Sequence, residues 1–131
     1  MPGEYVPGKC NIGRRGRATR LSIGLVILGL STAAVFFLFR AATPSVVRLV
    51  LIIPFYVGLM SILEGTLSFC VFHAAKGTFD LYEKVGPIGK SETKVQIESD
   101  EWKKADRRKA RNMHTEAALG AIVLTLTVFF A

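Results

Sequence analysis

Three long apolar stretches constrain the fold of this chain more than any other feature. They cover Leu21–Phe39, Leu49–Phe72 and Thr115–Ala131, which is almost half of the 131 residues. The hydrocarbon core of a bilayer is about 30 Å thick and needs about 20 apolar helical residues to cross it. Each stretch is long enough to do so, or nearly so. The sequence therefore predicts an all-α integral membrane protein with three transmembrane helices.

The distribution of basic residues predicts how these helices are oriented. The chain has a net charge of +7. Its 17 Lys and Arg residues divide into five before the first stretch, two between the first and second, and ten between the second and third. Basic residues near span ends stay on the cytoplasmic side. We therefore expect a multi-pass protein of the cell membrane with its N-terminus in the cytoplasm and its C-terminus outside. The first stretch is longer than the core of a signal peptide, so we expect it to be retained.

Turn and cap residues divide the chain into four segments. We expect Thr43 to cap the second helix with Pro44 at its first position, Pro54 to kink it, and Gly77 to end it after Ala75. The expected segments are a basic cytoplasmic N-terminal segment at 1–20, transmembrane helices one and two at 21–75, a cytoplasmic loop or small hairpin at 76–98, and a third helix at 99–131.

The second connection contains signals for a hairpin and for the start of a helix. Gly86–Pro87 and Gly89 are typical of turns, and the alternation in Lys94–Glu98 is typical of a short strand. Ser99 can cap a helix whose first turn holds Asp100 and Glu101. No proline or glycine follows until the third apolar stretch is under way. We therefore expect one helix that extends from the cytoplasm into the membrane.

Glu64 is the only charged residue in the second apolar stretch. An ionisable residue inside a membrane helix usually faces the bundle interior and is a candidate for function. Counting equal depth into the other stretches predicts a buried polar cluster of Glu64, Ser31, Ser61, Ser68 and Thr125. Three interpretations stay open: a protonated glutamate that hydrogen-bonds helices together, an ion or proton pathway, and a contact with another subunit.

Small residues recur at helical spacing around Glu64. Small side chains let transmembrane helices approach closely. The predicted helix-packing face consists of Gly58, Ser61, Gly65, Ser68, Ala117 and Ala121.

All cysteines and histidines of the chain are expected near one membrane level. Cys10, Cys70, His73 and His114 have the composition of a zinc site, and a pair of histidines could bind haem. Only Cys70 and His73 form a local pair, however, so we expect no cofactor and keep zinc or haem as the alternative. In the reducing cytoplasm the two cysteines are expected to be thiols.

Basic residues near the expected inner ends of the helices predict contact with lipid. Each Lys or Arg at an anionic leaflet contributes about 1 kcal/mol. We expect anionic headgroup contacts from Arg14, Arg15, Arg17, Arg20, Lys109 and Arg111. Nucleic acid is not an expected partner, because only Trp102 accompanies the basic run Lys103–Arg111.

The sequence contains no phosphate-binding glycine loop and no recognised hydrolase motif, so we expect no enzyme. The favoured function is a small accessory or scaffolding subunit, as a homo-oligomer or in a larger membrane complex. The alternatives are an oligomeric channel or transporter that uses Glu64, and a metal- or haem-binding membrane protein.

Four short motifs resemble those of a group of small prokaryotic membrane proteins of uncharacterised function. They are Cys10-Asn11-Ile12-Gly13 with the following arginines, Phe69-Cys70, Gly77-Thr78-Phe79-Asp80, and Asp106-Arg107-Arg108-Lys109-Ala110. The resemblance implies the same three-helix layout and no activity. It draws attention to Cys10 and Cys70 together.

Overall fold

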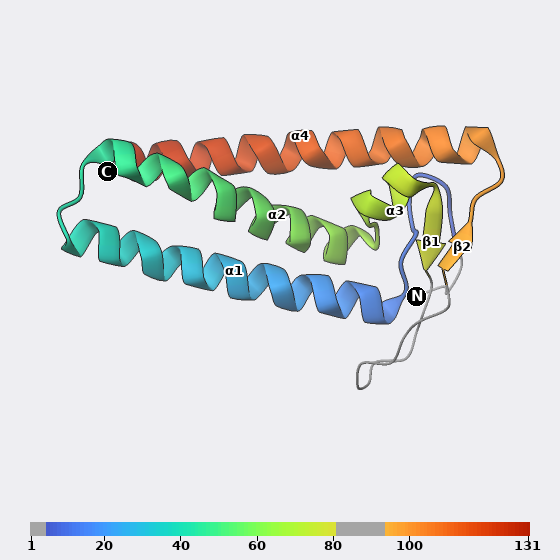
Figure 1. Cartoon of the computed structure of the whole chain (residues 1–131), viewed down its shortest axis with the longest axis horizontal. Helices are drawn as coiled ribbons and strands as arrows, with labels where there is room; N and C mark the ends of the chain where they lie inside the picture. The colour runs from blue at the N-terminus through green and yellow to red at the C-terminus, as the bar shows by residue number, and fades with distance from the viewer. Residues whose placement is uncertain (1–4, 81–93) are drawn as a thin grey trace.

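The computed structural model describes residues 5–80 and 94–131, and most of them are helical. In chain order the elements are α1 (Arg14–Arg40), the 3₁₀ helix η1 (Ser45–Leu51), α2 (Ile52–Leu67), α3 (Val71–Lys76), β1 (Thr78–Asp80), β2 (Lys94–Gln96) and α4 (Asp100–Phe130). The helices α1, α2 and α4 form an elongated bundle, and α3, β1 and β2 gather at one end of it (Figure 1). We call this end, with the N-terminal segment before α1, the polar end.

Three helices are long and apolar enough to cross a membrane: α1, α4, and η1 together with α2 over Ser45–Leu67. This agrees with the three spans expected from the apolar stretches. The apolar side chains that cover the outside of the bundle, such as Leu30, Phe37 and Val123, are exposed in the isolated chain. A bilayer would solvate such surfaces.

Close contact between α1 and α2 depends on glycine. A Cβ atom added to Gly65 would lie 2.5 Å from Leu21 Cγ, and one added to Gly58 would lie 2.7 Å from Leu28 Cδ2. On the other side of α2, Ala117 and Ala121 of α4 are buried. The residues Gly58, Gly65, Ala117 and Ala121 of the expected packing face therefore lie at helix contacts.

The second helix is shorter than expected. We predicted continuation to Ala75, but α2 ends at Leu67 because Ser68 adopts the left-handed conformation (φ 56°, ψ 40°). The backbone N–H groups of Asn11 and Ile12 donate to the carbonyl of Ser68, at 3.0 and 3.4 Å, so the interrupted backbone is paired with a distant segment. The short helix α3 then follows, and Gly77 ends it in the left-handed conformation, as expected.

The connection between α1 and α2 also differs from expectation. The Thr43 hydroxyl donates to the Leu38 carbonyl at 3.0 Å, so Thr43 closes the end of α1 and does not cap the next helix. Pro44 is the N-cap of η1. Pro54, where we predicted a kink within one helix, lies in the first turn of α2, just after the change from 3₁₀ to α geometry at Leu51. In a continuous α-helix the Pro54 ring would clash with the carbonyl four residues earlier.

The remaining elements follow the expected pattern. Strands β1 and β2 are antiparallel, with Phe79 opposite Val95. The expected turns at Gly86–Pro87 and Gly89 lie outside the described residues. Helix α4 runs unbroken for 31 residues. The Ser99 side chain caps it by accepting from the Trp102 backbone N–H at 3.5 Å, which confirms the predicted start.

Candidate functional site

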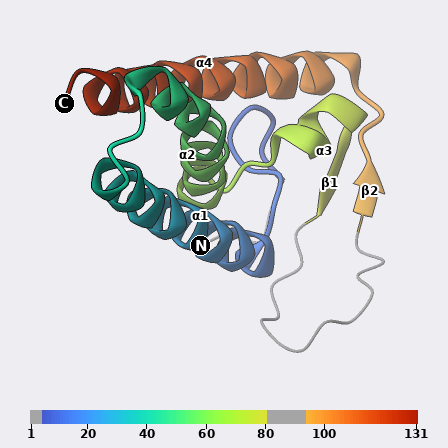
Figure 2. The same ribbon diagram turned by 60° about the vertical axis from the view of Figure 1, so that its left-hand side comes forward.

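The N-terminal segment is a structural part of the polar end. It passes between α2 and α3 before it enters α1 (Figure 2). Asn11 is fully buried. Its side chain accepts from the Cys70 N–H at 2.6 Å and donates to the Cys70 carbonyl at 3.0 Å. One amide side chain thus satisfies both backbone groups of Cys70 where α2 and α3 are interrupted.

Asp106 ties the same segment to α4. It is fully buried, and its carboxylate accepts from the Gly8 N–H at 2.7 Å and from the Tyr5 hydroxyl at 2.8 Å. The Tyr5 ring stacks on Phe79 of β1 with centroids 4.4 Å apart and meets Trp102 of α4 at 5.8 Å. Burial raises the pKa of Tyr5, and the hydrogen bond to the negative carboxylate raises it further. The phenol therefore stays protonated and keeps donating.

Glu64 joins three helices. Its carboxylate accepts from Arg20 Nε of α1 at 3.2 Å and from the Val71 N–H of α3 at 2.9 Å. Glu64 is buried, and the Arg20 side chain is 23% exposed. The contacts favour the interpretation in which Glu64 holds helices together, with the guanidinium of Arg20 and the backbone of Val71 as its partners.

The structure does not join the other members of the expected polar cluster to Glu64. The hydroxyls of Ser31 and Thr125 each donate at 2.7 Å to carbonyls of their own helices, those of Ile27 and Ala121. The depth count was wrong because α2 ends three residues after Glu64. This places Glu64 at the level of Arg20, eleven residues or about 16 Å along α1 from Ser31.

Ser61 and Ser68 lie on the same helix as Glu64 or at its end. Ser61 is half-buried, and Ser68 is buried as the C-cap of α2. Ser68 contributes its backbone carbonyl to the N-terminal segment, and this backbone role was not foreseen.

The cysteines and histidines are not gathered into one set. His114 hydrogen-bonds and stacks with Tyr56, whereas His73 Nδ1 lies 2.8 Å from the Thr78 hydroxyl. Cys10 Sγ donates to the Ile12 carbonyl at 3.5 Å. Within residues 5–80 and 94–131, no group of three or more His, Cys, Asp or Glu residues could hold a metal ion. The zinc alternative therefore has no geometric support there, and for haem the two histidines bind different residues, Tyr56 and Thr78.

Two of the arginines expected at lipid headgroups bind protein groups. Arg17 Nε donates to the Gly65 carbonyl at 3.1 Å. Arg20 binds Glu64, donates to the Gly16 carbonyl at 3.2 Å, and donates through Nη2 to Cys70 Sγ at 2.9 Å. The absence of a side chain at Gly65 brings its backbone carbonyl within reach of Arg17. Among the other residues of that prediction, Arg14 and Arg111 are exposed, and Arg15 and Lys109 are half-buried.

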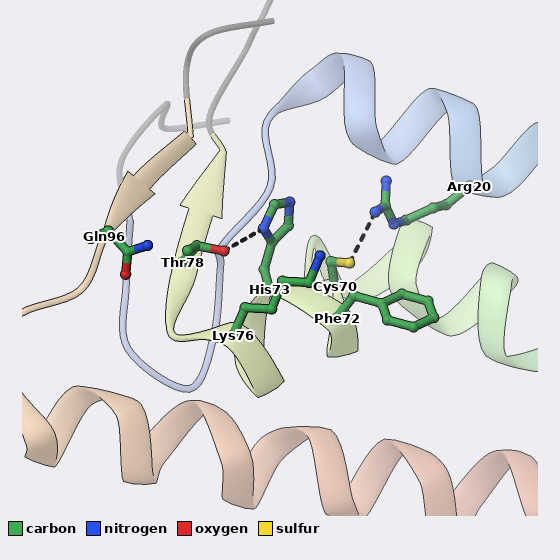
Figure 3. A pocket seen from close by; sticks show the side chains of 7 residues that line it. All are labelled: Arg20, Cys70, Phe72, His73, Lys76, Thr78 and Gln96. Carbon is green, nitrogen blue, oxygen red and sulfur yellow. Dashed lines mark hydrogen bonds between the residues drawn. The ribbon is translucent and has the colours of Figure 1, made fainter.

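A pocket of about 670 Å³ opens beside this arginine. Arg20 reaches it from α1, His73 and Lys76 from α3, and Thr78 and Gln96 from the two strands (Figure 3). Its described lining residues are Arg20, Cys70, Phe72, His73, Lys76, Thr78 and Gln96. They include two permanent cations and a histidine but no carboxylate. We call this the cationic pocket.

Sequence reasoning missed Asn11, Asp106 and Tyr5. A signal was available for Asp106, because it follows the same helical period as Ala110, Met113 and Ala117, all buried. An acid in line with the apolar side chains of a helix is expected to face inward and to need a partner. Nothing comparable distinguishes Asn11 before the fold is known.

The motifs that carry the family resemblance meet at the polar end. Asn11 binds Cys70, Tyr5 stacks on Phe79, and Asp106 binds the backbone of Gly8. Comparison with protein-family models, with curated proteins and with solved structures finds no significant match to this chain.

Proposed function

We propose that this chain is a multi-pass protein of the cell membrane and works as a non-catalytic accessory or scaffolding subunit. It acts either as a homo-oligomer or inside a larger membrane complex. The polar end, including the N-terminus, lies in the cytoplasm and the C-terminus lies outside. The charge distribution supports this orientation, since the polar end carries most of the Lys and Arg residues.

The observation that carries the proposal is a pair of small residues on α1, Gly29 and Ala33, that are exposed in the described chain. A Cβ atom added to Gly24 would lie 2.8 Å from Ile62, whereas one added to Gly29 would meet nothing within 4 Å. Ala33, one turn further on, is exposed as well. A small residue followed four positions later by another is typical of the contacts between transmembrane helices.

The burial of α1 supports the same conclusion. In the most apolar part of α1, only 11% of the residues are buried inside the chain. The corresponding share is 22% in each of the other two candidate spans. Small residues offer little apolar area to lipid, yet they allow a helix of another subunit to approach closely. The Gly29–Ala33 face therefore fits a partner helix.

The test is the oligomeric state of the purified protein. We expect the unmodified protein to run as an oligomer, or with a partner from native membranes, in native mass spectrometry and light scattering in mild detergent. Gly29→Leu combined with Ala33→Leu should weaken the association at least about tenfold, since two bulky side chains keep the helices apart. Thr127→Leu, on an exposed position of α4, is the control and should change nothing.

Two results would contradict the proposal. One is an unmodified protein that is monomeric and purifies without a partner. The other is an oligomer that survives both leucines on α1.

The channel alternative has less support. Both carboxylate oxygens of Glu64 are bound inside the protein, to Arg20 and to the Val71 backbone. A residue held in this way is suited to fixing helices rather than to passing ions.

A further inference from the structure

The cationic pocket has an excess of positive charge. The charge of Arg20 is offset by Glu64, 3.2 Å away, but Lys76 is exposed and adds its own charge at the pocket wall. The three hydrogen bonds that Arg20 makes account for three of the five donors of a guanidinium. The amide of Gln96 and the ring of His73 add polar groups to the same wall. Such a lining suits an anion with several acceptor oxygens.

The position of the pocket adds a second constraint. Arg20 directly precedes Leu21, where the first apolar stretch begins, and Phe72 closes the second one. The Phe72 ring lines the pocket and is 70% exposed. The pocket thus combines cationic and polar walls with an exposed aromatic rim, at the level where apolar helices give way to the polar end. The exposed Phe72 ring offers an apolar surface to lipid chains at this level.

We propose that the cationic pocket binds a phosphate group, carried either by a lipid headgroup or by a small soluble phosphate. Phosphate presents several charged oxygens, which guanidinium and ammonium donors bind by charge-assisted hydrogen bonds. The volume of about 670 Å³ lies in the usual range for ligand sites and leaves room for more than the phosphate alone. The proposal does not depend on the association of α1 with a partner, so each can fail without the other.

Lys76 is the residue to change, because it is exposed and lies at the end of a short helix. Its replacement should leave the Arg20–Glu64 pair and the fold intact, and circular dichroism checks this. Lys76→Glu reverses one charge inside the pocket. Lys104→Glu makes the same change at an exposed position of α4 that does not line the pocket, and it is the matched control.

The experiment measures phosphate binding by the full chain in nanodiscs. One arm compares pure phosphatidylcholine with phosphatidylcholine that contains a tenth of phosphatidic acid, by native mass spectrometry of retained lipid. The second arm adds inorganic phosphate to pure phosphatidylcholine nanodiscs and follows the thermal midpoint and ³¹P relaxation. Lys76→Glu should weaken binding about 30-fold, because it removes one cation and adds one anion, and Lys104→Glu should change it less than about twofold.

The outcomes separate the two sources. A lipid headgroup is supported as the ligand if phosphatidic acid is retained saturably, if Lys76→Glu abolishes this retention, and if inorganic phosphate does not displace the lipid. Saturable binding of inorganic phosphate with the same dependence on Lys76 supports a soluble phosphate. No saturable binding in either arm overturns the proposal. An equal loss in Lys76→Glu and Lys104→Glu does so too, because it indicates general attraction to surface charge.

Discussion

At the scale of single residues, Glu64 shows how an acidic side chain in an apolar helix takes a structural role. The sequence marks it as costly and therefore worth explaining. In the structure one carboxylate oxygen meets Arg20 of α1 and the other meets the backbone of α3. One side chain therefore links three helices. Its two charge-assisted hydrogen bonds offset the free-energy cost of burying the carboxylate.

The substitution Glu64→Gln tests whether Glu64 links the helices in this way. Glutamine can still accept from the Val71 N–H but leaves the half-buried Arg20 without its counter-charge. We expect the free energy of unfolding to fall by about 2 kcal/mol in a denaturing-detergent titration. Glu116→Gln, at an exposed position of α4, is the control and should lie within about 0.5 kcal/mol of the unmodified protein.

The same variant also tests the channel alternative. If the unmodified protein conducts ions in liposomes and Glu64→Gln removes that flux without loss of stability, the structural role assigned to Glu64 is wrong.

At the scale of elements, the packing of α1 on α2 depends on where side chains are missing. At Gly65, a Cβ atom would meet the branched Cγ of Leu21 at 2.5 Å and the backbone oxygen of Arg17 at 3.1 Å. Neither can move away without a shift of α1. The close approach also brings Arg17 within reach of the Gly65 carbonyl, so one glycine serves both packing and hydrogen bonding.

Alanine substitutions at Gly65 and Gly29 should therefore have opposite effects on the free energy of unfolding. Gly65→Ala should destabilise the protein by about 1–3 kcal/mol because it overpacks the α1–α2 contact. Gly29→Ala adds the same methyl group where its own chain leaves open space, and the better helix propensity of alanine should stabilise by up to about 1 kcal/mol. Thermal or detergent unfolding of the two variants side by side gives the comparison. Equal effects at the two positions would contradict the packing described here.

At the scale of the whole molecule, three segments far apart in sequence close the polar end. The N-terminal segment binds the break between α2 and α3 through Asn11 and binds α4 through Asp106. These contacts give the polar end a fixed structure on which the cationic pocket is built.

The orientation of the molecule is testable with two exposed positions at opposite ends. Ser45 begins η1, and Lys104 lies in the polar half of α4. In intact cells a membrane-impermeant maleimide should label Ser45→Cys, and it should label Lys104→Cys only after permeabilisation. The alternation of basic residues predicts this result. The reverse pattern would place the polar end and the cationic pocket outside the cell.

The sequence alone predicted three helices long and apolar enough to cross a membrane and the Ser99 start of α4, and it singled out Glu64. These features depend on local hydropathy, capping and the cost of a buried charge, all of which can be judged from neighbouring residues. The strand at Lys94–Gln96 belongs to the same group, since alternation is also a local pattern.

The end of α2, the partner of Glu64 and the shape of the cationic pocket could not be read from the sequence, because each depends on residues far apart in the chain. The break at Ser68 is stabilised by Asn11, 57 positions earlier in the chain, and Glu64 meets Arg20 at a separation of 44. Such pairings depend on the distance between helices, which Gly58 and Gly65 set, and not on any pattern within one segment. The physical reason is that a backbone or charged group needs only some partner of the right chemistry, and packing selects which one comes near enough.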